Sequence, residues 1–129
     1  TYGGAADDMF SFYDILGRAK EVCPVFTIGL GKVMSAGVLL LAAGTKGHRY
    51  IGKNCRVMLH AVTAGNIGEL HNLQNEMEAI QQLQDSYTNA LVAETSMTKR
   101  QLNKLLDRKV NVYLTAEEAI EYGIADKIL

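Results

Sequence analysis

One long stretch, residues 67–94, constrains the fold of this chain more than any other part of its sequence. Its apolar residues recur every three or four positions, and Glu, Gln and Asn occupy most of the others: Ile67, Leu70, Leu73, Met77, Ile80, Leu83, Tyr87 and Leu91. This spacing predicts a single long helix with a narrow apolar stripe. Such a stripe on so long a helix suits packing against a partner rather than burial inside one core.

The rest of the chain alternates strand-like and helix-like segments. Short apolar runs predict buried strands at residues 25–28 and 55–60. Composition predicts another strand at residues 110–114, with further short strands near residues 50–51 and 124–129. Helices are predicted from a cap at Asp7 or Asp8 to about Lys20, at residues 38–44, and after the capping boxes that Thr98 forms with Gln101 and Thr115 with Glu118. This alternation predicts an α/β chain with mostly parallel strand pairing.

Bulk properties set limits on function. The chain has 129 residues, which suits one domain, and a net charge of −1, which offers no basic stripe for nucleic acid. Its longest apolar run, residues 38–43, is too short to span a bilayer. Cys23 and Cys55 lack zinc-site spacing, so we expect two buried, reduced thiols in a cytoplasmic protein.

Ser35 is the first candidate for chemistry. It follows a turn broken by Gly29 and Gly31 and precedes the apolar helix at residues 38–44. Free N–H groups at a helix N-terminus favour negative charge, and the amide of Ala36 is placed to stabilise an oxyanion. The alternative interpretation is that Ser35 only caps the helix.

His60 is the second candidate, because it ends the apolar run at residues 55–60. The carboxyl ends of strands are the usual place for ligands and catalysis in an α/β sheet. Imidazole titrates near neutral pH and is a natural proton acceptor for a serine. The alternative is a hydrogen-bonded core histidine. The histidines do not have the spacing of a metal site, so we expect no bound metal.

Several segments, taken together and in order, resemble the ClpP family, the proteolytic subunits of the ATP-dependent Clp protease. They are Gly3-Gly4 with Phe12-Tyr13-Asp14, the nucleophile-like segment from Gly31 to Gly37 and its continuation to Arg49, the histidine segment from Asn54 to His60, and the C-terminal segment from Leu114 to Asp126. The resemblance covers essentially the whole chain. It implies one domain, residues 1–129, with the ClpP/crotonase-type fold, from which the N-terminal part of the family fold is absent.

The resemblance also implies an activity and its partners. Ser35 would be the nucleophile and His60 the base of a serine endopeptidase that degrades unfolded polypeptides, with the amides of Gly4 and Ala36 as the oxyanion hole. The long helix would be a handle that joins two stacked heptameric rings of a homo-oligomer. An AAA+ Clp unfoldase would deliver substrates and consume ATP, so the chain itself would need no cofactor.

Some positions depart from the family pattern. The catalytic aspartate of the family falls on Asn111, which can orient an imidazole but supplies no negative charge. In the family, charged residues beside the catalytic aspartate couple the contact between the two rings to the catalytic residues. Their positions fall on Lys109 and Val110 in this chain. In the substrate-binding segment Gly65 matches a family glycine, whereas Asn66 replaces the next one. These changes predict an enzyme that is slower or dependent on a partner.

Alternative functions remain open on this sequence. The loss of the aspartate favours a ring subunit with a structural role and little or no activity. A crotonase-type acyl-CoA enzyme would share the fold, but such enzymes usually rely on carboxylates, and no Glu adjoins Ser35 or His60. A serine–lysine peptidase would need a lysine in the site, and Lys32 lies too close in sequence to be an obvious base.

Overall fold

A computed structural model describes residues 1–108 and 110–129 of the chain. Its helices are α1 (Ala6–Lys20), α2 (Ala36–Ala42), α3 (Leu70–Glu94), α4 (Lys99–Leu106) and α5 (Ala116–Glu121). Its strands are β1 (Thr27–Gly29), β2 (Lys32–Met34), β3 (Arg49–Ile51), β4 (Arg56–Leu59), β5 (Val112–Leu114) and β6 (Lys127–Ile128). The α/β class predicted from the alternation of segments is confirmed. Lys109, one of the positions that depart from the family pattern, lies outside the described residues.

The strands form two small sheets with the orders β1-β3-β6 and β2-β4-β5. All neighbours pair in parallel except β4 and β5, so the prediction of mostly parallel pairing is confirmed. Strand β2 was not predicted, because Gly29 and Gly31 on either side of Leu30 indicate a turn and not a strand. β2 pairs with β4 in the register Met34 to Met58, which fixes where the residues after both strands lie.

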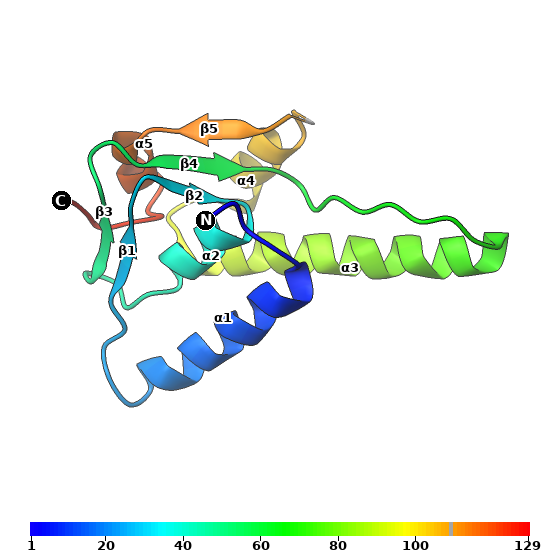
Figure 1. Cartoon of the computed structure of the whole chain (residues 1–129), viewed down its shortest axis with the longest axis horizontal. Helices are drawn as coiled ribbons and strands as arrows, with labels where there is room; N and C mark the ends of the chain where they lie inside the picture. Colours follow the sequence, from blue (N-terminus) through cyan, green and yellow to red (C-terminus); the bar gives the residue numbers. More distant parts are fainter. Residues whose placement is uncertain (109) are drawn as a thin grey trace.

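Helix α2 occupies the centre of the molecule, between the sheets, α1 and the base of α3 (Figure 1). Val38, Leu39 and Ala42 are fully buried, as predicted for a helix that is apolar on every side. Burying a Val or Leu side chain stabilises a fold by about 1.5–3 kcal/mol. The core therefore holds α2 rigidly, and with it the turn that precedes the helix.

The N-terminal part corrects three expectations. The N-cap of α1 is Ala5, and Asp7 and Asp8 lie in the first turn, where their charge favours the helix dipole. The run at residues 25–28 is not a buried strand: β1 begins at Thr27 on the edge of its sheet, and Phe26 and Ile28 are each 58% exposed. Apolar composition alone cannot tell an edge strand from a central one. Cys23 is exposed and only Cys55 is buried; both thiols are free.

Helix α3 confirms the predicted long helix, although it begins at Leu70, three residues later than expected. Only its C-terminal part is buried, through Tyr87, Thr88, Ala90 and Leu91. The N-terminal turns project beyond the rest of the molecule, and the segment that leaves β4 runs alongside them (Figure 1). Met77 is 71% exposed on this projecting part. Within the described residues, no helix has the length and apolar character needed to cross a membrane.

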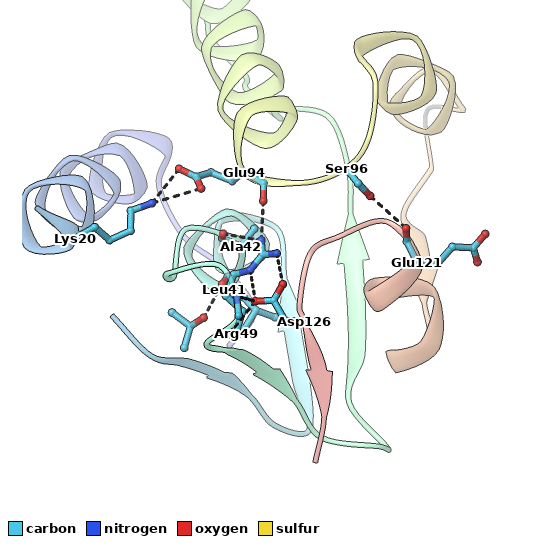
Figure 2. Close-up of polar contacts among 10 residues, drawn as sticks. Lys20, Leu41, Ala42, Arg49, Glu94, Ser96, Glu121 and Asp126 are labelled. Carbon is cyan, nitrogen blue, oxygen red and sulfur yellow. Dashed lines mark hydrogen bonds and ion pairs between the residues drawn. The ribbon is translucent and has the colours of Figure 1, made fainter. Parts of the chain in front are cut away.

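A buried arginine joins four parts of the fold. Arg49 is 3% exposed, and its guanidinium donates to Asp126 through Nη2 at 2.6 Å and Nε at 2.8 Å (Figure 2). Its Nη1 donates to the carbonyls of Ala42 at 3.1 Å and Glu94 at 2.7 Å. Hydrogen bonds from Arg49, aided by the amide of Gly47, lower the pKa of Asp126 to about 2. The buried charge is therefore paired and hydrogen-bonded, as stability requires.

The side chain of Glu94 extends this network to α1. It accepts hydrogen bonds from the hydroxyl of Tyr13 at 3.0 Å and from Nζ of Lys20 at 3.3 Å. Burial, with a smaller contribution from Glu94, raises the pKa of Tyr13 to about 12. Glu94 thus joins α1 to Arg49: its carboxylate binds α1, and its main-chain carbonyl accepts from Arg49.

Candidate active site

Ser35 lies on the sharp turn between β2 and α2, in a backbone conformation that residues other than glycine rarely adopt. Its φ is 53° and its ψ is −122°, and it is the only non-glycine residue with a positive φ in the described parts of the chain. Such a conformation costs about 1–3 kcal/mol and persists only where the surroundings enforce it. Here the Ser35 amide donates to the carbonyl of Met58 at 2.8 Å, and the Tyr87 hydroxyl donates to the Ser35 carbonyl at 3.3 Å.

The hydroxyl of Ser35 is not used to cap α2. Ser35 occupies the N-cap position, but its side chain makes no capping hydrogen bond. The amide of Ala36, at the first position of the helix, is one of the N–H groups that a helix leaves without an internal acceptor. The turn therefore presents a hydroxyl and a helix N-terminus together.

Gly3 packs directly on this turn. A Cβ atom at Gly3 would lie 2.6 Å from the Cβ of Ser35 and 2.8 Å from the carbonyl oxygen of Met34, and Gly3 itself has a φ of +94°. Both facts require glycine. The close approach brings the backbone of Gly4 to the edge of the site.

His60 reaches Ser35 from the neighbouring strand. Because β2 and β4 are parallel and in the register Met34 to Met58, the residues after both strands meet at the same edge of the sheet. The Nε2 atom of His60 lies 2.8 Å from Oγ of Ser35. The Nδ1 atom lies 2.5 Å from the carbonyl oxygen of Ala61, which can only accept. Nδ1 therefore carries the proton, and Nε2 is free to accept the hydroxyl proton of Ser35.

A small pocket of about 130 Å³ opens beside the serine and the imidazole. Its lining includes both residues proposed for the oxyanion hole and is otherwise mostly apolar: Gly4, Ala5, Ala6, Met9, Ser35, Ala36, His60, Val62, Thr63 and Tyr87. Burial raises the pKa of Tyr87, so its phenol stays neutral and remains a donor to the Ser35 carbonyl. The pocket has room for one medium-sized apolar side chain.

The structure does not bring every predicted site residue to this pocket. The register of β4 and β5, continued by one residue from Leu59 and Val112, places Asn111 opposite His60. Asn111 is exposed, and the oxygen bonded to Nδ1 is that of Ala61. Gly65 and Asn66 are exposed outside the pocket lining, and the Asn66 side chain accepts from the amide of Ile67 at 2.8 Å.

Two alternatives from the sequence concern Lys32 and a bound metal. The ammonium group of Lys32 lies 3.3 Å from the centre of the Tyr2 ring, whereas the group bonded to the Ser35 hydroxyl is His60. No group of three or more His, Cys, Asp or Glu side chains that could hold a metal occurs among residues 1–108 and 110–129.

Two parts of the site had no signal in the sequence. The Ala61 carbonyl is a main-chain atom, so no residue type identifies it. Gln84, whose side chain accepts from the amide of Val62 at 2.7 Å, is one of several glutamines on α3. Its hydrogen bond to Val62 distinguishes it from the others only in the folded chain.

Ser35 lies on a strained turn between a strand and a helix and is bonded to an imidazole from the next strand. This arrangement is typical of hydrolases that use a serine nucleophile. The family comparison supports the coarser class of peptidases. Residues 1–129 match the family model described as Clp protease, so the chain belongs to the Clp protease family. It is thus a ClpP-like member of a family of peptidases, as the resemblance predicted.

Proposed function

We propose that the chain is a serine endopeptidase that cleaves unfolded polypeptides through an acyl-enzyme, with Ser35 as nucleophile and His60 as base. One observation supports it above all: the hydroxyl of Ser35 lies 2.8 Å from the unprotonated nitrogen of His60. That distance is within the range for direct proton transfer between a nucleophile and its base.

The proposed reaction proceeds in two halves. Ser35 Oγ attacks the peptide carbonyl carbon and its proton passes to Nε2 of His60, while the amides of Gly4 and Ala36 hold the oxyanion. The C–N bond then breaks, and His60 gives that proton to the leaving amine. In the second half, water gives a proton to His60 and attacks the ester, which releases the acid and restores the Ser35 hydroxyl.

A fluorophosphonate probe tests this proposal without knowledge of the natural substrate. The probe forms a covalent bond to an activated serine oxygen. We expect the wild-type protein to be labelled and Ser35→Ala to remain unlabelled, with labelling measured by the mass of the intact chain. Ser86→Ala is the matched control, since Ser86 is exposed on α3. A wild-type protein that is assembled and folded but does not react would contradict the proposal.

The proposal includes an assembly and a partner. The projecting part of α3 leaves large apolar side chains exposed, with Leu70 at 67% and Met77 at 71%. Its role would be that of the family handle, joining two stacked rings of this chain. A Clp unfoldase would use ATP to feed extended substrates, whose backbone would pair with the segment around Gly65 and Asn66. The proposed location is the cytoplasm.

A weakly active or inactive ring subunit is the second candidate. The observation that favours it is the group bonded to Nδ1, which is a neutral carbonyl and not a carboxylate. Asn111, which we propose as the third member in place of aspartate, is also neutral. Neither group offsets the charge of the imidazolium that forms during each proton transfer. A crotonase-type activity has no comparable support, since Ser35 is bonded to a histidine.

Restoring the carboxylate should increase reactivity. In Asn111→Asp we expect the rate of fluorophosphonate labelling at pH 7 to rise about tenfold, because a negative charge opposite His60 stabilises the imidazolium. The expected change is measured as a second-order rate constant. Asn54→Asp adds the same charge at an exposed position and serves as control. Equal rates for the two variants would exclude Asn111 from the third position.

A further inference from the structure

The peptide group between Ala61 and Val62 makes two hydrogen bonds, one on each side. Its carbonyl oxygen accepts from Nδ1 of His60 at 2.5 Å, and its N–H donates to Oε1 of Gln84 at 2.7 Å. A peptide group is planar, so a bond that fixes its N–H also fixes the direction of its C=O. The orientation of the imidazole therefore depends on an atom of Gln84.

Gln84 is itself held in place. It lies on α3 and is half-buried, and its Nε2 donates to Oγ1 of Thr88 one turn further along, at 3.2 Å. Thr88 is 3% exposed, in the part of α3 packed on the core. The Nε2 contact leaves the side-chain carbonyl directed at Val62. The chain of contacts thus runs from the rigid base of α3, through one amide side chain and one peptide group, to His60 and Ser35.

Hydrogen bonds in such a chain polarise one another. When Gln84 accepts from the N–H of Val62, electron density in the peptide group moves toward the carbonyl oxygen of Ala61. That oxygen becomes a better acceptor for the Nδ1–H of His60. This matters most during proton transfer, when His60 is positively charged and no carboxylate is bonded to it. The arrangement supplies, through a peptide group, part of what an aspartate would supply directly.

We propose that Gln84 is a positioning residue for His60, acting through the Ala61–Val62 peptide group, and that it partly replaces the missing carboxylate of the triad. This inference rests on the proposed serine chemistry. It concerns a residue that touches neither the serine nor the imidazole. The charged groups that line the same pocket as Gln84 are Asp85, Lys99 and Asp107, and they are unchanged in the variants below.

The test compares side chains of different reach at one position. Gln84→Asn keeps the amide but withdraws it by one methylene, so it cannot reach Val62. Gln84→Glu keeps an acceptor at the original reach. Gln82→Asn makes the first change at an exposed position of the same helix and reproduces its cost in helix propensity. Each protein is reacted with the fluorophosphonate probe from pH 5 to pH 9.

We expect Gln84→Asn to react about fivefold to tenfold more slowly than wild type at pH 7, the order of one lost hydrogen bond. The acidic limb of its pH profile should also move to lower pH, because imidazolium is less well stabilised. A purely structural role would not move that limb. Gln84→Glu keeps the acceptor and adds a negative charge, so it should restore the rate and its acidic limb should not lie below that of wild type. Gln82→Asn should match wild type.

The two proposals fail in different ways. If wild type does not react with the probe, the serine chemistry is wrong. If wild type reacts and Gln84→Asn has the same rate and profile, or if Gln82→Asn loses as much, the role of Gln84 is wrong. Should Gln84→Asn fail to fold, a Gln84→Glu protein that folds but reacts as slowly as His60→Ala would overturn the inference, since its acceptor is intact.

Discussion

Replacing His60 by alanine is expected to lower the rate of peptide cleavage by about 10⁴-fold or more. The reason is local: in the structure the Ser35 hydroxyl is bonded to His60, and a hydroxyl without a base is a poor nucleophile at neutral pH. The effect should fall on kcat, because the role proposed for the imidazole is to move protons and not to bind the rest of the substrate. The measurement is the steady-state cleavage of fluorescein-labelled casein, an unfolded polypeptide.

The matched control for this variant is His71→Ala. His71 is exposed in the first turn of α3, so its loss should leave the cleavage rate within about twofold of wild type. A His60→Ala protein that cleaves casein as fast as His71→Ala would show that His60 is not the base. Because each variant removes one imidazole, general effects of that loss cancel.

The largest effect on stability is expected for Asp126→Asn. This change leaves the guanidinium of Arg49, which is 3% exposed, without its charged partner. Breaking a buried ion pair on one side typically costs about 3–5 kcal/mol of unfolding free energy. The Asp126 side chain is 21% exposed, so we expect the lower end, about 3 kcal/mol. Urea unfolding at pH 7 and fixed protein concentration measures it.

The same pair predicts how acid affects stability. The folded-state pKa of Asp126, about 2, lies below its ordinary value of 3.8. The group therefore stabilises the fold fully above about pH 5, and this contribution, roughly 2 kcal/mol, is lost as the pH falls toward 2. The difference between wild type and Asp126→Asn should shrink between pH 5 and pH 2.5.

An exposed carboxylate provides the comparison. Asp14→Asn, on the outer face of α1, should change the unfolding free energy by less than about 0.5 kcal/mol at any pH in this range. If Asp126→Asn were as stable as Asp14→Asn, the buried pair would not hold the parts of the fold together. A constant difference from pH 5 to pH 2.5 would show that its pKa is not lowered.

Local signals in the sequence were enough to predict most elements. The capping boxes at Thr98 and Thr115 are both present, with their reciprocal hydrogen bonds, because they depend only on residues three apart. The short strand β2 was missed, since its three residues are held by pairing with β4 and not by their own propensity. The exposure of Phe26 followed from the position of β1 at a sheet edge, which the local sequence does not encode.

The candidate site was also predictable only in part, because only some of its features depend on local sequence. The start of a predicted apolar helix indicated Ser35, and the end of a predicted strand indicated His60. The positive φ of Ser35 was not predictable, because it results from Gly3, the carbonyl of Met58 and Tyr87, all distant in sequence. The acceptor for Nδ1 is a backbone atom, and its neighbour Gln84 looks like any solvent-facing glutamine until the helix is docked.

The division of α3 into a projecting part and an embedded part has a consequence for how this sequence can diverge. If the projecting part mediates assembly as proposed, substitutions in the outer turns around Met77 should change the assembly and spare the proposed chemistry. Near Tyr87 the helix supports the Ser35 turn, so substitutions there should change reactivity instead. Each end of this helix could then be altered without disturbing the role proposed for the other.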